Sequence, residues 1–259
     1  MPQEPLNFWG LSTSRYKLTL SYDGTEYSGW QVQPNGQAIQ PLVQRAIETV
    51  LRHPIRLSAS GRTDAGVHAL AQIAHFDSPT QILPLRFILS ANALLPPDIR
   101  ILACEPVPPS FHSRYHATGK IYHYSLQLGH TLDPFHRRTR THLIASLDIP
   151  LIRSAAPLFI GTHDFTSFSN QPNKGAASRD PIRTLTRLDI FHAPPLLRFE
   201  FEGDGFLYKM VRNITGTLLE IGRHKRPLAD IPLLFAARDR RRVGPAAPPQ
   251  GLCLIQVRY

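Results

Sequence analysis

The sequence predicts an α+β protein made of two halves, each with the element order β-α-β-β-α-β. The chain has 259 residues, which is enough for one large domain or two closely packed halves. Apolar residues alternate with polar ones in several short segments and recur at helical spacing in others. These segments follow one another in the same order twice, which is the ferredoxin-like pattern of antiparallel sheets with helices on one face.

The first half, residues 15–110, opens with a strand at 16–22, where apolar and polar side chains alternate. Apolar residues then recur at helical spacing from Ile39 to Leu51, which predicts an amphipathic helix with Pro41 tolerated in its first turn. The further elements expected in this half are two strands, a helix and a strand, at 55–60, 69–76, 84–95 and 99–105.

The second half, residues 111–259, repeats this order with looser spacing. Between the halves, the prolines of residues 106–110 neither continue a helix nor donate to a strand, which favours a hinge there. Residues 1–14 lack a periodic pattern and are expected to form an extension. The strands expected in the second half are 120–128, 184–192, 196–202 and 252–258. Its expected helices are 148–160, 206–224 and 228–238.

Composition excludes several classes of protein. No stretch approaches the roughly 18 to 20 apolar residues that span a bilayer, and the start of the chain lacks a signal-peptide pattern. We therefore expect a cytoplasmic protein without a membrane segment. The two cysteines, Cys104 and Cys253, are too few for a disulfide framework or a cysteine-rich zinc site.

The net charge of +10 lies entirely in the second half of the chain. Residues 1–110 carry 8 basic and 8 acidic side chains, whereas residues 111–259 carry 21 and 11. Only five of the 29 basic residues are lysine, and the flat fork of arginine suits contacts with phosphate. This bias has two explanations that composition leaves open: a nucleic-acid partner, or a genome rich in arginine codons.

The loop GRTDAGVHA (61–69) lies between two predicted strands and contains Asp64, the only acid in that region. Its glycines allow a sharp turn, and Arg62 places a positive charge beside the carboxylate. A carboxylate kept ionised in this way suits a nucleophile or a general base. The alternative is an ordinary Asx-type turn, which does not account for the block as a whole.

Two further segments contain candidate functional residues. Residues 111–124 interleave aromatic and basic side chains on a predicted strand, which is typical of a nucleic-acid surface; an ordinary strand with buried tyrosines is the alternative. Arg212 lies beside the apolar stripe of the helix over 206–224, so it either pairs with an acid such as Asp64 or extends along the flank of the helix. We also expect Arg137, Arg138 and Arg140 to contact RNA.

Six blocks of sequence resemble, in order, the tRNA pseudouridine synthase A (TruA) family, over essentially the whole chain from residue 16 onward. The block GRTDAGVHA is the most specific of them. The six are YDGTEYSGWQVQPN (22–35), ASGRTDAGVHALAQIAHF (59–76), FHSRYHATGKIYHY (111–124), GTHDFTSF (161–168), GFLYKMVRNITGTLLEIG (205–222) and APPQGLCLIQVRY (247–259).

The resemblance implies a pseudouridine synthase fold whose two halves flank a central cleft and form one catalytic unit. It implies an isomerase of tRNA processing that converts uridine to pseudouridine at positions 38, 39 and 40 of the anticodon stem-loop. Neither a metal nor a cofactor is implied. It further implies a homodimer in which a basic cleft from both subunits holds the tRNA.

Five residues match functional positions of the family. Asp64 matches the catalytic aspartate, which begins cleavage of the N1 glycosidic bond. Tyr122 matches the residue that stacks on the uracil and assists removal of the C5 proton, and Arg212 matches the arginine that pairs with the aspartate. Arg62 matches the residue that fills the space of the extruded base, and Leu252 matches an apolar wall of the uracil pocket. Attack at C1′, attack at C6 and abstraction of the 2′ proton remain open as routes for the carboxylate.

Two other classes of function compete with this assignment. A non-catalytic RNA-binding module with the same fold explains the charge and the tyrosines but gives Asp64 no role. A nucleic-acid hydrolase needs a metal cluster or a second carboxylate near Asp64, and the sequence displays neither.

Overall fold

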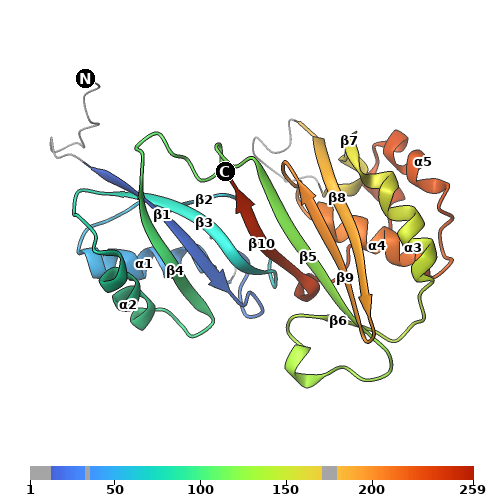
Figure 1. The fold of residues 1–259 in the computed structure, drawn as a ribbon, viewed down its shortest axis with the longest axis horizontal. Coiled ribbons are helices and arrows are strands. Elements are labelled where there is room, and N and C mark those ends of the chain that lie inside the picture. Colours follow the sequence, from blue (N-terminus) through green and yellow to red (C-terminus); the bar gives the residue numbers. More distant parts are fainter. Residues whose placement is uncertain (1–12, 33–35, 171–179) are drawn as a thin grey trace. The chain divides into compact units, whose positions relative to one another are not determined.

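The computed structural model describes residues 13–32, 36–170 and 180–259. The chain divides into two compact units, shown in Figure 1. The first unit comprises the chain up to Ala117 with residues 255–257 and Tyr259, and the second comprises Thr118–Leu254 with Arg258. Of the extension expected over residues 1–14, all but the last two residues lie outside the described residues.

The division falls between Ala117 and Thr118 and not at the prolines of residues 106–110. The segment between these prolines and Ala117 is hydrogen-bonded to the first unit. The hydroxyl of Ser113 lies 2.8 Å from Nδ1 of His75 and donates to the carbonyl of Ser58 over 2.9 Å. These contacts are made by a side chain that is fully buried, so the segment belongs to the core of the first unit.

The first unit has the predicted order of six elements, β-α-β-β-α-β. Its strands lie in the order β4-β1-β3, with β2 paired to β3, and every one of these pairs is antiparallel. Along β1 the side chains alternate between a buried and a half-exposed face, as the sequence pattern predicted. The elements are β1 (Ser14–Tyr22), α1 (Ile39–Leu51), β2 (Ser58–Ala59), β3 (His68–Ser78), α2 (Pro84–Leu94) and β4 (Ile99–Val107).

Strand β2 is much shorter than the strand expected at 55–60. The backbone N–H of Ile55 donates to the carboxylate of Glu48 over 3.1 Å, and the carbonyl of Leu57 accepts from the amide of Gln40 over 2.9 Å. Both partners are side chains of α1. This stretch therefore satisfies its backbone on a helix and leaves only two residues for the ladder.

The second unit contains every element predicted for it and two additional short strands, β6 and β7. Its strands lie in the order β10-β5-β9-β8-β7, with β6 beside β5. The pair β5–β6 is parallel, so this sheet is mixed and the expectation of purely antiparallel sheets is wrong. The elements are β5 (Gly119–Leu128), β6 (Thr141–Leu143), α3 (Ile149–Ala155), β7 (Gly161–Asp164), β8 (Ile182–Ala193), β9 (Leu196–Gly203), α4 (Met210–Gly222), α5 (Asp230–Ala237) and β10 (Leu252–Arg258).

Helix α4 begins at Met210, four residues later than the helix expected from residue 206. Lys209 has a left-handed backbone with φ 60°, and the N–H of Met210 donates to the carbonyl of Leu207 over 3.0 Å. Residues 206–209 are thus a separate turn in front of the helix. Among the described residues, no helix is long and apolar enough to cross a membrane.

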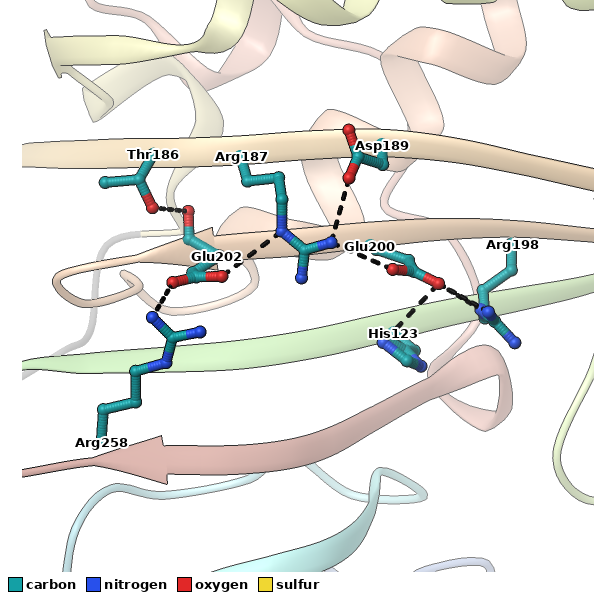
Figure 2. Close-up of polar contacts among 8 residues, drawn as sticks. All are labelled: His123, Thr186, Arg187, Asp189, Arg198, Glu200, Glu202 and Arg258. Atoms are coloured by element: carbon teal, nitrogen blue, oxygen red, sulfur yellow. Dashed lines mark hydrogen bonds and ion pairs between the residues drawn. The ribbon is translucent and has the colours of Figure 1, made fainter.

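One face of the sheet in the second unit is packed with apolar side chains, and the other carries charged ones (Figure 2). Arg187 is central to the charged face. Its guanidinium lies 3.0 Å from Asp189, 3.1 Å from Glu200 and 3.3 Å from Glu202. The other members of this network, which come from β5, β9 and β10, are His123, Arg198 and Arg258.

Candidate active site

Asp64 lies in the loop between β2 and β3. Its side chain is half-buried and that of Arg62 is exposed, whereas Thr63 and Val67 are buried. The loop closes as a tight turn, in which the N–H of Val67 donates to the carbonyl of Asp64 over 3.1 Å and Gly66 adopts φ +75°. The alternation of buried and accessible residues anchors the loop at both sides of the carboxylate while leaving the carboxylate within reach of solvent.

Backbone hydrogen bonds tie this loop to the segment that follows β1. The N–H of Gly66 donates to the carbonyl of Tyr27 over 3.2 Å, and the N–H of Trp30 donates to the carbonyl of Thr63 over 3.1 Å. The hydroxyls of Tyr22 and Thr63 are 2.9 Å apart and share a buried hydrogen bond. We call residues 22–30 the cradle, because they hold the backbone on both sides of Asp64.

Two glycines of the cradle allow the chains to approach closely. A Cβ on Gly24 would lie 2.0 Å from the carbonyl oxygen of Val67, and a Cβ on Gly29 would lie 2.6 Å from the carbonyl oxygen of Thr63. Gly29 also has φ +101°, which L-residues rarely adopt. The spacing of glycines in the cradle is therefore a requirement of the Asp64 loop.

Two further side chains stabilise this arrangement. Gln72 of β3 is fully buried and donates to the carbonyl of Gly61 over 3.0 Å, which fixes the start of the loop. Tyr27 donates its hydroxyl to Asp98 over 2.7 Å. Burial and this hydrogen bond raise the pKa of Tyr27, so the hydroxyl remains a donor at neutral pH. Neither residue was assigned a role from the sequence, although both lie in blocks that resemble the family.

Tyr122 lies on β5 in the second unit and is buried, with 8% of its surface exposed. Its ring meets the ring of Phe206 edge-on, with centroids 5.1 Å apart and planes at 80°. Phe206 is part of the turn before α4, and sequence reasoning assigned it no role. The pair forms a rigid aromatic corner, a geometry that aromatic rings favour.

Arg212 lies in the first turns of α4 and is half-buried. Its Nε donates to the carbonyl of Ala247 over 2.7 Å, and the N–H of Ala247 donates back to the carbonyl of Arg212 over 2.9 Å. A Cβ on Gly216 would lie 2.1 Å from the carbonyl oxygen of Pro245, so the segment around Ala247 rests directly on the helix. The side chain of Arg212 is thus fixed by a hydrogen bond to the backbone of Ala247, unlike a side chain that only extends along the flank of a helix.

Leu252 is buried at the start of β10, immediately after this segment. Tyr124 of β5 anchors the approach, since its hydroxyl donates to the carbonyl of Pro248 over 2.9 Å and lies 2.7 Å from the hydroxyl of Thr141. Burial raises the pKa of Tyr124 above its usual range, although the bond to Thr141 and the charge of Arg212 act in the opposite direction. Residues 245–252 therefore connect α4 to β5.

The five residues expected from the sequence divide between the units. The first unit holds Arg62 and Asp64 on one loop, and the second holds Tyr122, Arg212 and Leu252 on β5, α4 and β10. Within residues 13–32, 36–170 and 180–259, no group of three or more histidine, cysteine or acidic side chains is placed to hold a metal ion.

Comparison with known proteins gives the family. The family model described as tRNA pseudouridine synthase matches residues 19–116 and 155–259. The chain is 54% identical to "tRNA pseudouridine synthase A 1" of Protochlamydia amoebophila, over 94% of this chain and 96% of that protein. It is 43% identical to "tRNA pseudouridine synthase A" of Exiguobacterium sp. and of Geobacter sulfurreducens, over 95% and 94% of this chain and 98% of each relative.

A solved structure also aligns with the chain. A chain of the "archaeal box H/ACA sRNP Nop10-Cbf5 complex" covers 79% of this chain and 43% of its own length, with a TM-score of 0.37 and 13% identity. We base the assignment on the sequence relatives alone. Because the family model and relatives of this identity extend over most of its length, the chain belongs to the tRNA pseudouridine synthase family.

Proposed function

We propose that this tRNA pseudouridine synthase isomerises uridine at positions 38, 39 and 40 of the anticodon stem-loop, with Asp64 as its single catalytic carboxylate. The observation that carries the proposal is the loop held by the cradle. It fixes the backbone on both sides of Asp64 while the side chain stays half-buried and the neighbouring Arg62 is exposed. A reactive group on a rigid support keeps its geometry when the substrate arrives.

The reaction needs one carboxylate and no added reagent. The bond from C1′ to N1 breaks, the uracil rotates, and a bond from C1′ to C5 forms. The proton on C5 is released to solvent, and N1 takes up a proton in exchange. Because uridine and pseudouridine are isomers, no oxidant or reductant enters this balance. Attack of Asp64 at C1′, attack at C6 and abstraction of the 2′ proton are all compatible with a single aspartate.

The remaining site residues receive roles in handling the base. Extrusion of a base from its stack costs a few kcal/mol, which insertion of another group and stacking on a ring offset. We assign the insertion to Arg62, which is exposed, and the stacking and C5 deprotonation to Tyr122, whose ring is fixed by Phe206. Leu252 supplies an apolar wall of the uracil pocket, and Arg212 supports the charge of the aspartate.

The test is the Asp64→Asn variant with tRNA carrying tritium at C5 of its uridines. We expect this variant to bind tRNA with the affinity of the wild type and to release no tritium, because only the ionisable group is lost. Glu105→Gln is a matched control, since it makes the same change at an exposed acid of the first unit that pairs with Lys17. Release by Asp64→Asn at the wild-type rate would refute the catalytic assignment.

The same assay separates the enzyme from a non-catalytic RNA-binding module. A binding module binds tRNA but releases no tritium even as the wild-type protein. The enzyme instead releases tritium in proportion to the pseudouridine formed. Carbodiimide mapping of bulk tRNA, from cells with and without this protein, then identifies the positions modified. Loss of pseudouridine at sites other than 38 to 40 would refute the assigned positions.

The proposal also covers assembly and fold. We assign a cytoplasmic homodimer that needs no cofactor, with the two units as ferredoxin-like halves of one catalytic fold. The strand order β4-β1-β3, with β2 beside β3, supports this for the first unit. Sedimentation of the purified chain tests the assembly, and a mass equal to one chain at micromolar concentration would refute the dimer.

A further inference from the structure

The connection between β5 and β6 displays an aromatic side chain in an unusual position. Phe135 has 90% of its surface exposed, although most residues of this connection are polar or basic. A large apolar side chain held almost entirely in water gains nothing from the hydrophobic effect in the free protein. Its position therefore needs another explanation.

The connection is ordered by its own hydrogen bonds. The carboxylate of Asp133 accepts from the N–H of Phe135 over 2.9 Å and caps a single 3-10 turn, Pro134–His136. The N–H of Arg140 then donates to the carbonyl of His136 over 2.9 Å. These bonds fix the backbone on both sides of Phe135, so the ring is displayed from a preformed turn.

Both ends of the connection are tied to the sheet. At the start, Gln127 donates to the carbonyl of Thr131 over 3.0 Å, and at the end, Thr141 pairs in parallel with Leu126 of β5. Thr141 also shares the buried hydrogen bond with Tyr124, the residue that anchors the segment before Leu252. The turn is thus attached to the strand that carries Tyr122.

The charges around the ring favour a polyanion. Arg137 and Arg138 are exposed and Arg140 is half-buried, while Asp133, the one acid from residue 129 to residue 142, caps the turn. An exposed aromatic ring within five residues of three arginines is the combination that stacks on a base and pairs with its flanking phosphates. A second copy of this chain is the poorer partner, because it would bring the same basic side chains to the contact.

We propose that residues 129–141 form a separate RNA-binding element, in which Phe135 stacks on an unpaired base of the tRNA and the arginines bind the adjacent phosphates. This inference rests on the proposed function and adds a contact for tRNA that takes no part in the chemistry. It accounts for the exposure of Phe135, the capped turn that displays it and the basic side chains around it.

The test compares four variants in tRNA binding at several salt concentrations. Phe135→Ala is expected to raise Kd by about 5- to 100-fold, which is the usual effect of losing one stacked base. Phe135→Tyr keeps the ring and should bind as the wild type, whereas Phe135→Leu should bind weakly. Leu85→Ala, at an apolar residue of α2 with 70% of its surface exposed, is the control and should leave Kd unchanged.

Salt dependence distinguishes the ring from the arginines. Phe135→Ala should weaken binding by the same factor at every salt concentration, because a neutral side chain releases no counterions. Replacement of Arg137, Arg138 and Arg140 by Gln should instead flatten the dependence of log Kd on log salt, by up to about one unit of slope for each phosphate that the protein no longer neutralises. At saturating tRNA, all these variants should release tritium at the wild-type rate.

Three results would overturn the inference. The first is an unchanged Kd for Phe135→Ala, and the second is wild-type binding by Phe135→Leu, which would exclude stacking. The third is a change in the sedimented mass of Phe135→Ala, which would identify the ring as a contact between copies of the chain. The proposed isomerase activity has a separate criterion, since it fails when the wild type itself releases no tritium.

Discussion

The cradle makes a sharp prediction about Gly29, whose substitution by alanine should impair catalysis more than folding. A Cβ at this position would lie 2.6 Å from the carbonyl oxygen of Thr63 and 3.1 Å from both the nitrogen of Ala65 and the carbonyl carbon of Asp64. Ordinary contacts begin near 3.4 Å, so the first distance is too short by about 0.8 Å. The added methyl group therefore presses on three consecutive residues centred on the proposed catalytic aspartate.

The size of the effect follows from two separate costs. The backbone of Gly29, at φ +101°, is strained for alanine by about 1–3 kcal/mol, whatever space surrounds it. Relief of the contact requires the backbone of residues 63–65 to move by several tenths of an ångström, which also strains the bond from the N–H of Trp30 to Thr63. Displacement of a reacting group by about 1 Å lowers rates by about 100-fold, so we expect kcat to fall about 10- to 100-fold.

Gly129 provides the matched control. It has nearly the same backbone, with φ +108°, but a Cβ there would meet nothing within 4 Å. Urea unfolding of Gly129→Ala should show a loss of stability similar to the strain in Gly29→Ala. Its tritium release at saturating tRNA should stay at the wild-type rate, because residues 129–141 take no part in the chemistry. A Gly29→Ala enzyme that is destabilised to the same extent as the control but keeps its full kcat would show that the cradle does not position Asp64.

Three further predictions concern stability, each measured by urea unfolding. Tyr124→Phe removes a buried hydroxyl with two hydrogen-bond partners and should cost about 1–3 kcal/mol, whereas Tyr208→Phe, at an exposed ring, should cost nothing measurable. Burial lowers the pKa of His75 to about 4, so the unfolded chain takes up the proton first, and this histidine should lower stability by about 1–3 kcal/mol as the pH drops from 6.5 to 4. His75→Asn should remove that contribution and leave those of the other titrating groups. Burial alone would raise the pKa of Glu200, but hydrogen bonds from Arg198 and the charges of its other cationic neighbours lower this pKa overall. The stabilisation that Glu200 provides is therefore present above its ordinary pKa and is lost as the pH falls further. Glu200→Gln should cost about 1–3 kcal/mol at pH 7 and nothing at acidic pH.

Local patterns predicted the long elements of this fold well. The helix expected over residues 39–51 is present with those bounds, because its apolar residues recur at a spacing that only a helix buries on one side. Strands β6 and β7 have three and four residues, too few for an alternating pattern to be visible. The late start of α4 depends on the left-handed backbone of Lys209. Lysine rarely adopts this conformation, so the residue type does not predict it.

Single candidate residues for the site could be named from the sequence, but their arrangement could not. The block around Asp64 was recognisable from its letters, since Gly66 and its neighbours are what such a turn needs. The contacts that hold it, from Tyr22 and Gln72, join residues about 10 to 40 positions apart, and periodicity carries no information on such pairs. Phe206 was missed for the same reason, since its ring matters only because β5 passes beside it.

The charged face of the second unit changes the meaning of the net charge from which we inferred an RNA partner. Arg187, Arg198 and Arg258 contribute three of the basic residues counted there, yet each is engaged by Glu200 or Glu202 within the sheet (Figure 2). Their positive charge is largely cancelled by these neighbours before any ligand arrives, so a count of arginines overstates the electrostatic attraction that a phosphate experiences. The field that attracts RNA must come from the smaller set of arginines whose guanidinium groups are not neutralised by the fold.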